Sequence, residues 1–229
     1  MLFGVLGDIH GDFAALERVM RSHSDVPFWL SVGDVADAEG RYVAPMAPLY
    51  WIKGNNEDFE FVERSRRETM LTNLHYLPNA VLTRVSTLSV AGLGGTFAPT
   101  WYDTPAADLP KARPGGRDDK RRHFVREEVD ACKALANVDV LLTHEAPRPY
   151  FVETGGVGER RSARRVDAGK TPINEVLAAL RPRLHFFGHH HRVTDAVRQG
   201  VRSIGLDLVS RSYVLVDAAS FAYETRALQ

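Results

Sequence analysis

The sequence predicts an α/β fold, and three observations support this prediction. Short apolar runs of strand length alternate with segments of helical periodicity over residues 1–65. Several of these runs end in glycine followed by a short polar side chain, where a strand would pass into a loop. Residues 193–225 alternate in the manner of strands, with turn residues between the runs. We therefore expect helices packed on a sheet, followed by further strands.

Composition limits the class of protein. The chain has 229 residues, of which 44% are hydrophobic, and this suits a single domain over 1–229 with a large core. Lys+Arg and Asp+Glu both number 29, so no global charge would draw the chain to nucleic acid or an anionic membrane. A single cysteine, Cys132, excludes an internal disulfide and is expected to be a small buried residue. The N-terminus lacks a signal peptide pattern and no apolar run reaches membrane-spanning length, so we expect a soluble, cytoplasmic protein without membrane association.

The N-terminal part contains three strand-to-loop transitions. An apolar run, 2–6, leads into Gly7-Asp8-Ile9-His10-Gly11, and an amphipathic helix follows, with Asp12 near its start. A second run, 26–32, ends in Gly33-Asp34-Val35-Ala36-Asp37. A third, 49–53, ends in Gly54-Asn55-Asn56-Glu57, and a charged helix opens at Asp58. Because ligands bind beyond the carboxyl ends of strands in open α/β sheets, we expect these three loops to converge.

The middle of the chain has a different character. The runs 74–77, 80–85 and 88–93 predict strands, with a hairpin that leads into a second sheet. Residues 96–117 form a long irregular segment, which is interpreted either as a substrate-covering loop or as a mobile loop without a functional role. Residues 118–136 predict a helix whose basic first turns, Lys120 to Arg126, would form a solvated face.

The C-terminal part repeats the strand-to-ligand pattern. The run 138–142 ends in Thr143-His144, and 183–187 ends in Gly188-His189-His190-His191. Between them lie an arginine-rich irregular loop, 155–169, and a helix with Thr171 as its N-cap. The last four runs, 193–197, 201–206, 212–216 and 221–225, predict an antiparallel second sheet.

These strand ends together offer seven candidate metal ligands. They are Asp8, His10, Asp34, Asn55, His144, His189 and His191. The set contains nitrogen and oxygen donors and no thiolate, which suits Mn, Fe or Zn rather than a soft ion. It is too large for one four-coordinate ion and fits two, which at about 3.5–4 Å apart would clamp both the entering and the leaving oxygen during displacement at phosphorus.

Five motifs carry these ligands: Gly7-Asp8-Ile9-His10-Gly11, Gly33-Asp34-Val35-Ala36-Asp37, Gly54-Asn55-Asn56-Glu57, Leu142-Thr143-His144 and Gly188-His189-His190-His191. In this order, over residues 7–191, they resemble the motifs of the calcineurin-like metallophosphoesterases. The resemblance implies a four-layer α/β/β/α sandwich with two packed mixed sheets and a dinuclear centre of two divalent ions, with Mn expected first. It implies that Asp8, His10 and His191 hold one ion, that Asn55, His144 and His189 hold the other, and that Asp34 bridges them. The catalytic positions would be Asp34, His10 and Asn56.

A finer resemblance concerns two segments. Gly92-Leu93-Gly94-Gly95-Thr96-Phe97 and Thr143-His144-Glu145-Ala146-Pro147-Arg148 look like the layout of the RNA lariat-debranching branch. Some members of that branch have cysteine at the first aspartate position, which here is Asp8. Specificity for a branched phosphodiester is therefore not carried over.

The sequence departs from the wider family at Asn56. The third motif usually reads Gly-Asn-His-Glu, and its histidine is thought to protonate the leaving group. Asparagine cannot act as a general acid at neutral pH, and such proton transfer contributes roughly 10²–10⁴-fold to rate. Three alternatives stay open: His123 or His190 protonates instead, water does, or the substrate has a good leaving group. If His190 is not the proton donor, it is expected to point away from the ligands. Asp37 is expected either to orient the groups around the ligands or to lie at the surface. Glu57 is expected to start a helix.

The predicted function is that of a metal-dependent phosphoesterase, most simply a phosphodiesterase acting on a nucleotide- or RNA-derived ester. A hydroxide between the two ions would attack phosphorus, and Arg148, Arg160, Arg161 and Arg164 would contact the substrate. The alternatives are a phosphomonoesterase or protein phosphatase of the same family, or a binding or scaffold member that has lost the chemistry. No obligate protein partner is evident, and a nucleic-acid binding module conflicts with the zero net charge.

Overall fold

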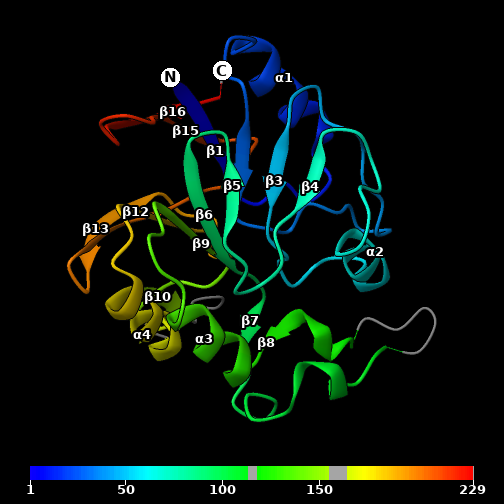
Figure 1. Cartoon of the computed structure of the whole chain (residues 1–229), viewed down its shortest axis with the longest axis vertical. Coiled ribbons are helices and arrows are strands. Elements are labelled where there is room, and N and C mark those ends of the chain that lie inside the picture. Colours follow the sequence, from blue (N-terminus) through cyan, green and yellow to red (C-terminus); the bar gives the residue numbers. More distant parts are fainter. Residues whose placement is uncertain (113–117, 155–163, 229) are drawn as a thin grey trace, which may run out of the picture.

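Two six-stranded mixed sheets pack face to face, and helices cover their outer faces (Figure 1). The computed structural model describes residues 1–112, 118–154 and 164–228. Two further pairs of short strands lie outside the main sheets. None of the helices in these ranges combines the length and the hydropathy that a membrane span needs.

The first sheet holds the N-terminal strands. Its central strands run parallel, and the two C-terminal strands join antiparallel beside β1. In spatial order the strands are β16 (Tyr223–Ala227), β15 (Ser212–Asp217), β1 (Leu2–Leu6), β2 (Trp29–Ser31), β3 (Leu49–Trp51) and β4 (Leu74–Tyr76).

The second sheet has parallel strands at its centre and an antiparallel pair at each edge. In spatial order the strands are β13 (Thr194–Arg198), β14 (Val201–Gly205), β12 (Leu184–Phe187), β9 (Val140–Thr143), β6 (Leu88–Leu93) and β5 (Thr83–Val85).

The sequence interpretation assigned three strands to the wrong sheet. β4 pairs with β3 and belongs to the first sheet, and only β5 and β6 form the expected hairpin of the second. β15 and β16 also belong to the first sheet, where β15 pairs with β1 along the whole length of β1. The last four strands therefore do not form one antiparallel sheet, and β14 lies parallel to β12. An alternating pattern identifies a strand but says nothing about its partner.

The helices complete the two outer layers. α1 (Phe13–Ser22) and α2 (Phe59–Ser65) are capped by Asp12 and Asp58, whose carboxylates accept backbone N–H groups. α1 and α2 pack on the first sheet, and α3 (Arg126–Lys133) and α4 (Thr171–Leu180) cover the second. α4 begins at Thr171 itself, so the N-cap is Lys170 and not Thr171 as predicted.

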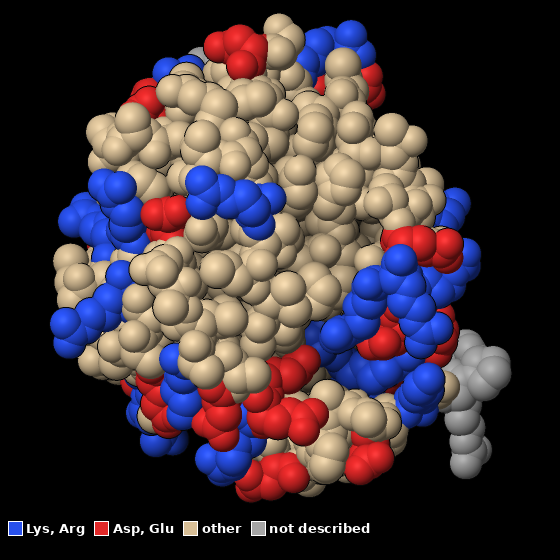
Figure 2. All heavy atoms as spheres, in the orientation of Figure 1, with Lys and Arg blue, Asp and Glu red and all other residues tan. Residues whose placement is uncertain are grey.

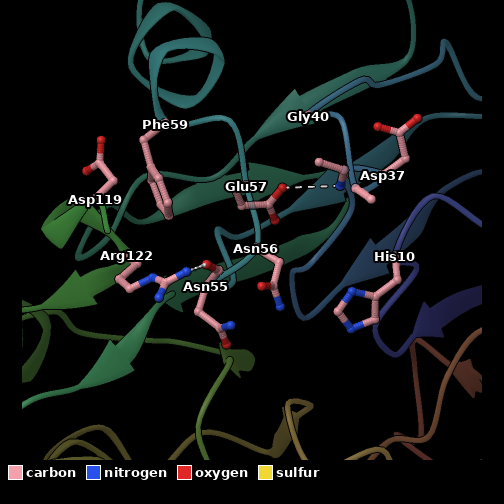
Figure 3. Close-up of a pocket in the computed structure, with 11 residues that line it drawn as sticks. His10, Asp37, Gly40, Asn55, Asn56, Glu57, Phe59, Asp119 and Arg122 are labelled. Carbon is pink, nitrogen blue, oxygen red and sulfur yellow. Dashed lines mark hydrogen bonds between the residues drawn. The ribbon is translucent and has the colours of Figure 1, made fainter. Parts of the chain in front are cut away.

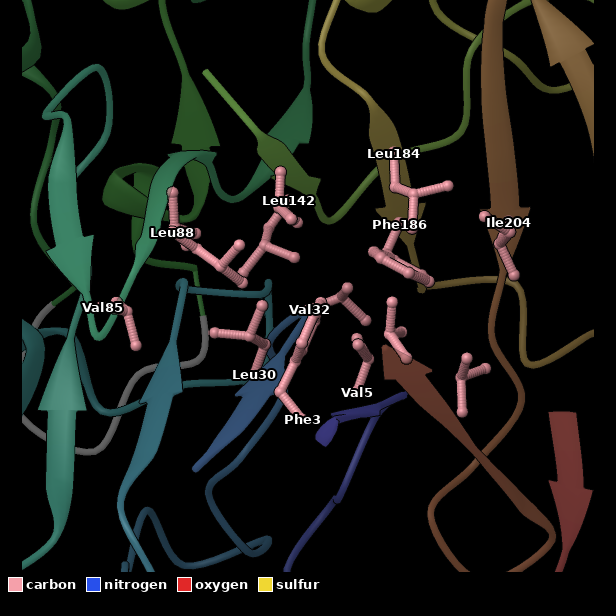
Figure 4. Close-up of a cluster of buried hydrophobic side chains, with 14 of the residues drawn as sticks. Phe3, Val5, Leu30, Val32, Val85, Leu88, Leu142, Leu184, Phe186 and Ile204 are labelled. Carbon is pink, nitrogen blue, oxygen red and sulfur yellow. The ribbon is translucent and has the colours of Figure 1, made fainter. Parts of the chain in front are cut away.

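A single apolar layer holds the sheets together (Figure 4). Phe3, Leu30 and Val32 of the first sheet face Leu142 and Phe186 of the second, and all five are fully buried. Each such side chain contributes about 1.5–3 kcal/mol to the free energy of unfolding. This layer fixes how the carboxyl ends of the two sets of parallel strands lie relative to one another, and it confirms the four-layer arrangement.

The basic segment after residue 117 is not one helix. It forms a short 3₁₀ turn (Lys120–Arg122), then β8 (His123–Phe124), and only then α3. β8 pairs in parallel with β7 (Thr96–Phe97), and the side chain of Phe124 is fully buried in the core beneath the second sheet. The irregular segment 96–117 therefore begins as a strand, and a second 3₁₀ turn (Ala106–Asp108) lies within it.

A hairpin was also missed between His144 and α4. β10 (Phe151–Thr154) and β11 (Arg164–Asp167) pair antiparallel, and β11 lies within the segment 155–169 that was predicted to be an irregular loop.

Candidate metal centre

The predicted ligands gather at one edge of the sandwich. Asp8, Asp34 and Asn55 follow β1, β2 and β3, while His144 and His189 follow β9 and β12. The two sheets contribute from opposite sides, so the site forms only when the sheets are packed.

Short distances link six of the seven ligand candidates. His191 Nε2 lies 3.0 Å from Asp8 Oδ2 and 3.1 Å from His10 Nε2. Asp34 Oδ2 lies 3.5 Å from His10 Nε2 and 3.6 Å from His144 Nε2. His144 Nε2 lies 3.0 Å from Asn55 Oδ1. These side chains therefore aim their donor atoms at a common space.

His189 joins the cluster through its ring and its backbone. Its imidazole lies 4.9 Å from that of His144, centroid to centroid. Its backbone N–H donates to both oxygens of Asp8 at 3.2 and 3.0 Å. Burial, together with the nearby His144, lowers the pKa of His189 to about 4, so its ring is neutral at pH 7, the form that binds metals.

The backbone is strained at the same positions. His10, Asp34, His189 and His191 all adopt positive φ angles of 47°, 50°, 67° and 48°. Such a conformation is uncommon for residues other than glycine and clusters at functional sites. Four of the seven predicted ligands thus have a backbone conformation that is sterically unfavourable for residues other than glycine.

Two glycines make room for the carboxylates. A Cβ atom at Gly54 would lie 1.9 Å from Asp34 Oδ1, and one at Gly188 would lie 2.2 Å from Asp8 Oδ1. The glycine before each ligand motif therefore allows a loop from one strand to approach the ligand of another.

The donor set suits divalent ions. Two groups of three side chains place one ligand atom each within 4.8 Å of one another: Asp8, His10 and His191, and Asp8, Asp34 and His144. Asp8 and Asp34 are buried, and in the described ranges no lysine or arginine forms an ion pair with either. Buried carboxylates need a compensating cation. The burial of His144 works against its protonation, yet Asp34 and Asp8 outweigh it and raise the pKa of His144.

Asn56 lies against Asp34. Its backbone N–H donates to Asp34 Oδ1 and its side-chain amide to Oδ2, each at 2.8 Å. It lines a cavity of about 480 Å³ together with His10, Asn55 and Arg122 (Figure 3). The position at which a general acid was expected therefore faces open space beside the cluster.

Glu57 has a structural role that the sequence interpretation missed. Its carboxylate is partly buried and accepts hydrogen bonds from the backbone N–H groups of Val35, Ala36 and Gly54 at 3.1–3.2 Å. It also accepts one from the hydroxyl of Tyr42 at 2.8 Å. Glu57 thus ties the loop that carries Asp34 to the loop that carries Asn55.

The expectation of a solvated basic face was wrong for two of its arginines. Arg121 is buried and pairs with Asp119 at 2.7 Å. Arg122 lines the cavity and donates to the carbonyl oxygen of Asn55 at 2.8 Å. The signal that could have identified them is Phe124, an aromatic residue that a solvated helical face would not contain.

The predicted substrate arginines lie elsewhere. Arg148 is exposed and pairs with Asp167 of β11 at 2.9 Å. Arg164 is exposed at the start of β11. Arg160 and Arg161 lie outside the described residues. Substrate contact by these four stays a prediction.

The remaining residues follow the sequence interpretation in part. His190 turns from the ligands and stacks on Tyr150, with ring centroids 4.6 Å apart. Asp37 accepts hydrogen bonds within its own loop from Glu39 and Arg41. Cys132 is buried, as expected. His123 pairs with the hydroxyl of Thr96 at 3.0 Å, and burial lowers its pKa.

Comparison with known proteins defines the class. A family model described as calcineurin-like phosphoesterase matches residues 1–193, and the chain belongs to this family. The two packed mixed sheets are the fold of that family.

Particular relatives are more distant. The chain is 28% identical over 208 residues to the lariat debranching enzyme of Schizosaccharomyces pombe, a match that covers 82% of this chain and 43% of the enzyme. The chain thus spans less than half the length of that relative. The crystal structure of TT1561 of Thermus thermophilus superposes with a TM-score of 0.65 at 14% identity, covering 100% and 99% of the two chains. GAP50, the anchor in the inner membrane complex of Plasmodium, gives a TM-score of 0.56 at 11% identity, covering 100% and 84%. These two structures share the fold.

Proposed function

We propose that this chain is a metal-dependent phosphodiesterase with a dinuclear centre, acting on a nucleotide- or RNA-derived ester. The observation that carries the proposal is the cluster of seven donor side chains at the joint edge of the two sheets, four of them on strained backbone. Family membership supplies the reaction class, and similarity to a lariat debranching enzyme favours an RNA-derived diester.

The chain's residues would divide between two ions. Asp8, His10 and His191 would hold one ion, Asn55, His144 and His189 the other, and Asp34 would bridge them. When bound, two divalent ions act as Lewis acids and lower the pKa of a water molecule to about 7. Mn²⁺ is the first expectation and Fe or Zn are the alternatives, because the donors are nitrogen and oxygen atoms only.

Asp34 and His10 would orient the reacting groups. Both hydrogen bonds from Asn56 go to Asp34, which fixes the carboxylate at the centre of the cluster. His10 lines the open cavity as well as the cluster, so it would lie between the ions and the ester. Through its hydrogen bonds to Val35 and Gly54, Glu57 would fix the position of the Asp34 loop relative to the Asn55 loop.

The charge distribution favours a small ester over a long nucleic acid duplex. Figure 2 shows lysines and arginines mixed with acidic residues around one face, with few charges over its centre. Long nucleic acids bind through broad basic surfaces. The centre of the face in Figure 2 carries few charges, which favours recognition of the substrate in the cavity beside the cluster.

A second candidate is a binding or scaffold protein that keeps the fold without turnover. The presence of Asn56 in place of a general acid favours it. A phosphomonoesterase or protein phosphatase of the same family is the third candidate.

A hydrolysis screen tests these candidates. Purified protein, treated with chelator and then reloaded with Mn²⁺, is assayed on phosphomonoesters, phosphodiesters and cyclic phosphates. We expect turnover of diesters that is lost on chelation and restored by Mn²⁺. Monoester-only turnover would support the phosphatase, and no turnover with any ester would support the scaffold.

A further inference from the structure

The backbone around Arg122 is fixed by a buried lysine. Lys53, which follows β3, is buried, and its ammonium donates to the carbonyl oxygens of Arg121 and His123 at 2.7 and 3.1 Å. The carbonyl of Lys53 in turn accepts the N–H of Gly95 at 2.8 Å. A Cβ atom at Gly95, whose φ is +93°, would lie 2.5 Å from the carbonyl oxygen of Arg122, so glycine is needed for this approach. The residues on both sides of Arg122 are thus held to the strand that carries the Asn55–Asn56 motif.

The side chain of Arg122 points into the cavity beside the metal centre. Figure 3 shows its guanidinium next to Asn55, with Asn56 between it and His10. One of its terminal nitrogens donates to the carbonyl of Asn55 at 2.8 Å, while its Nε is buried without a hydrogen-bond partner in the described part of the chain.

The charge of Arg122 is not neutralised by the neighbouring acid. Asp119 also lines the cavity, but both of its oxygens accept hydrogen bonds from Arg121, at 3.0 and 2.7 Å. Among the described residues, Arg122 forms no ion pair. A guanidinium whose flanking backbone is fixed, and which forms no ion pair with the described residues around the cavity, is a ready anion site.

Resting on the proposed function, we propose that the cavity takes the leaving group of the ester and that Arg122 contacts the leaving oxygen. The missing acid at Asn56 leaves that oxygen without a proton donor. As the bond between phosphorus and the leaving oxygen breaks, the electron pair stays on that oxygen, and Arg122 stabilises the negative charge by a charge-assisted hydrogen bond. Arg122 acts as a hydrogen-bond donor and transfers no proton, and the leaving oxygen takes its proton from water. At about 480 Å³ the cavity is large enough for a nucleoside-sized leaving group.

The test compares three variants: Arg122→Gln, Arg122→Lys and the control Arg126→Gln. Arg126 belongs to the same basic segment but pairs with Asp103 at the surface. Each Mn²⁺-loaded protein is assayed on methyl phosphodiesters whose leaving groups range from nitrophenol to simple alcohols. Binding of inorganic phosphate is measured by calorimetry, and metal content is determined for each variant.

For Arg122→Gln we expect a loss in kcat/KM of about 10-fold with nitrophenol and about 100-fold or more with alcohols, because charge-assisted hydrogen bonds matter most where charge develops. We expect phosphate affinity to fall about 10-fold, Arg122→Lys to recover part of both losses, and Arg126→Gln to match wild type. A loss that is equal for all leaving groups, or an unchanged phosphate affinity, would overturn the role of Arg122. Wild-type protein without turnover on any ester would instead overturn the proposed function.

Discussion

Asn56 donates two hydrogen bonds to one carboxylate, that of Asp34, at 2.8 Å each. The residue that replaces the expected general acid therefore orients the residue expected to bridge the two metal ions. This contact makes Asn56 a positioning residue in the present chain and leaves the protonation of the leaving group to another source.

The first prediction concerns the exchange Asn56→His. A histidine at this position restores a proton donor, so activity on alkyl phosphodiesters should rise by at least 10-fold, within the roughly 10²–10⁴-fold that general acid catalysis supplies. Activity on nitrophenyl diesters should change little, because nitrophenolate leaves without a proton. The ratio of kcat/KM for the two ester classes measures this. An equal change for both classes would contradict the assignment of position 56 to the leaving-group side.

The second prediction concerns Glu57. The variant Glu57→Ala leaves the buried N–H groups of Val35, Ala36 and Gly54 without an acceptor. We expect the free energy of unfolding to fall by about 3 kcal/mol, measured by urea denaturation. The control is Glu39→Ala, which removes only an exposed ion pair with Arg41 and should cost less than about 0.5 kcal/mol. Equal losses in the two variants would show that Glu57 does not connect the loops.

The third prediction concerns the glycine before Asn55. In Gly54→Ala, the new methyl group would lie 1.9 Å from Asp34 Oδ1, so Asp34 must move. We expect this variant to fold but to retain at most half of the wild-type metal, as determined by elemental analysis. Gly200→Ala serves as the control, since a Cβ atom added at Gly200 would meet no atom within 4 Å. This variant should keep its full metal content, although the positive φ of residue 200 should lower the free energy of unfolding by about 1 kcal/mol. Full metal content in Gly54→Ala would contradict the close packing of the two loops.

The fourth prediction concerns acid stability and His185, which is buried between the hydroxyls of Thr143 and Ser203. Burial lowers the pKa of His185 to about 3, compared with about 6.5 in an unfolded chain. Below pH 6.5 the unfolded chain therefore binds a proton that the folded chain does not. The contribution of neutral His185 to the free energy of unfolding is therefore fully present above pH 6.5. This contribution is lost as the pH falls toward 3, by up to about 1.4 kcal/mol per pH unit.

Urea denaturation of metal-free protein between pH 5 and pH 8 measures this slope. The variant His185→Gln can still bond both hydroxyls but cannot titrate, so its stability should depend less on pH than that of wild type. Parallel curves for the two proteins would refute the assignment.

The sequence predicted most of the candidate site because the signal is local. Each predicted ligand stands at the end of an apolar run, and in most cases next to a glycine, so Asp8, Asp34 and His189 could be identified without knowledge of their partners. The helix starts at Asp12 and Asp58 were predicted in the same way, and the structure adds that both residues are N-caps. The metal roles themselves stay a prediction, since the structure shows only that the donor atoms are close.

The errors come from interactions between distant residues. The pairing of β15 with β1 brings together residues more than 200 positions apart, and no local pattern encodes it. The segment around Arg122 has the composition of a helix, but the burial of Phe124 and the hydrogen bonds from Lys53 hold it as a turn and a strand. Tertiary contacts override local propensity in such segments. For the same reason, Glu57 was interpreted as a helix-start residue, although it lies one residue before the N-cap and binds two loops.

The measurement that tests the central claim most directly is the number of metal ions per chain, determined together with diesterase activity in wild type and in Asp34→Asn. We expect two ions per wild-type chain, and for Asp34→Asn the loss of at least one ion with a fall in activity of at least about 100-fold, since the bridging carboxylate would hold both ions in place. An active wild type with one ion or none, or an Asp34→Asn variant that keeps both ions and near wild-type turnover, would contradict the central claim.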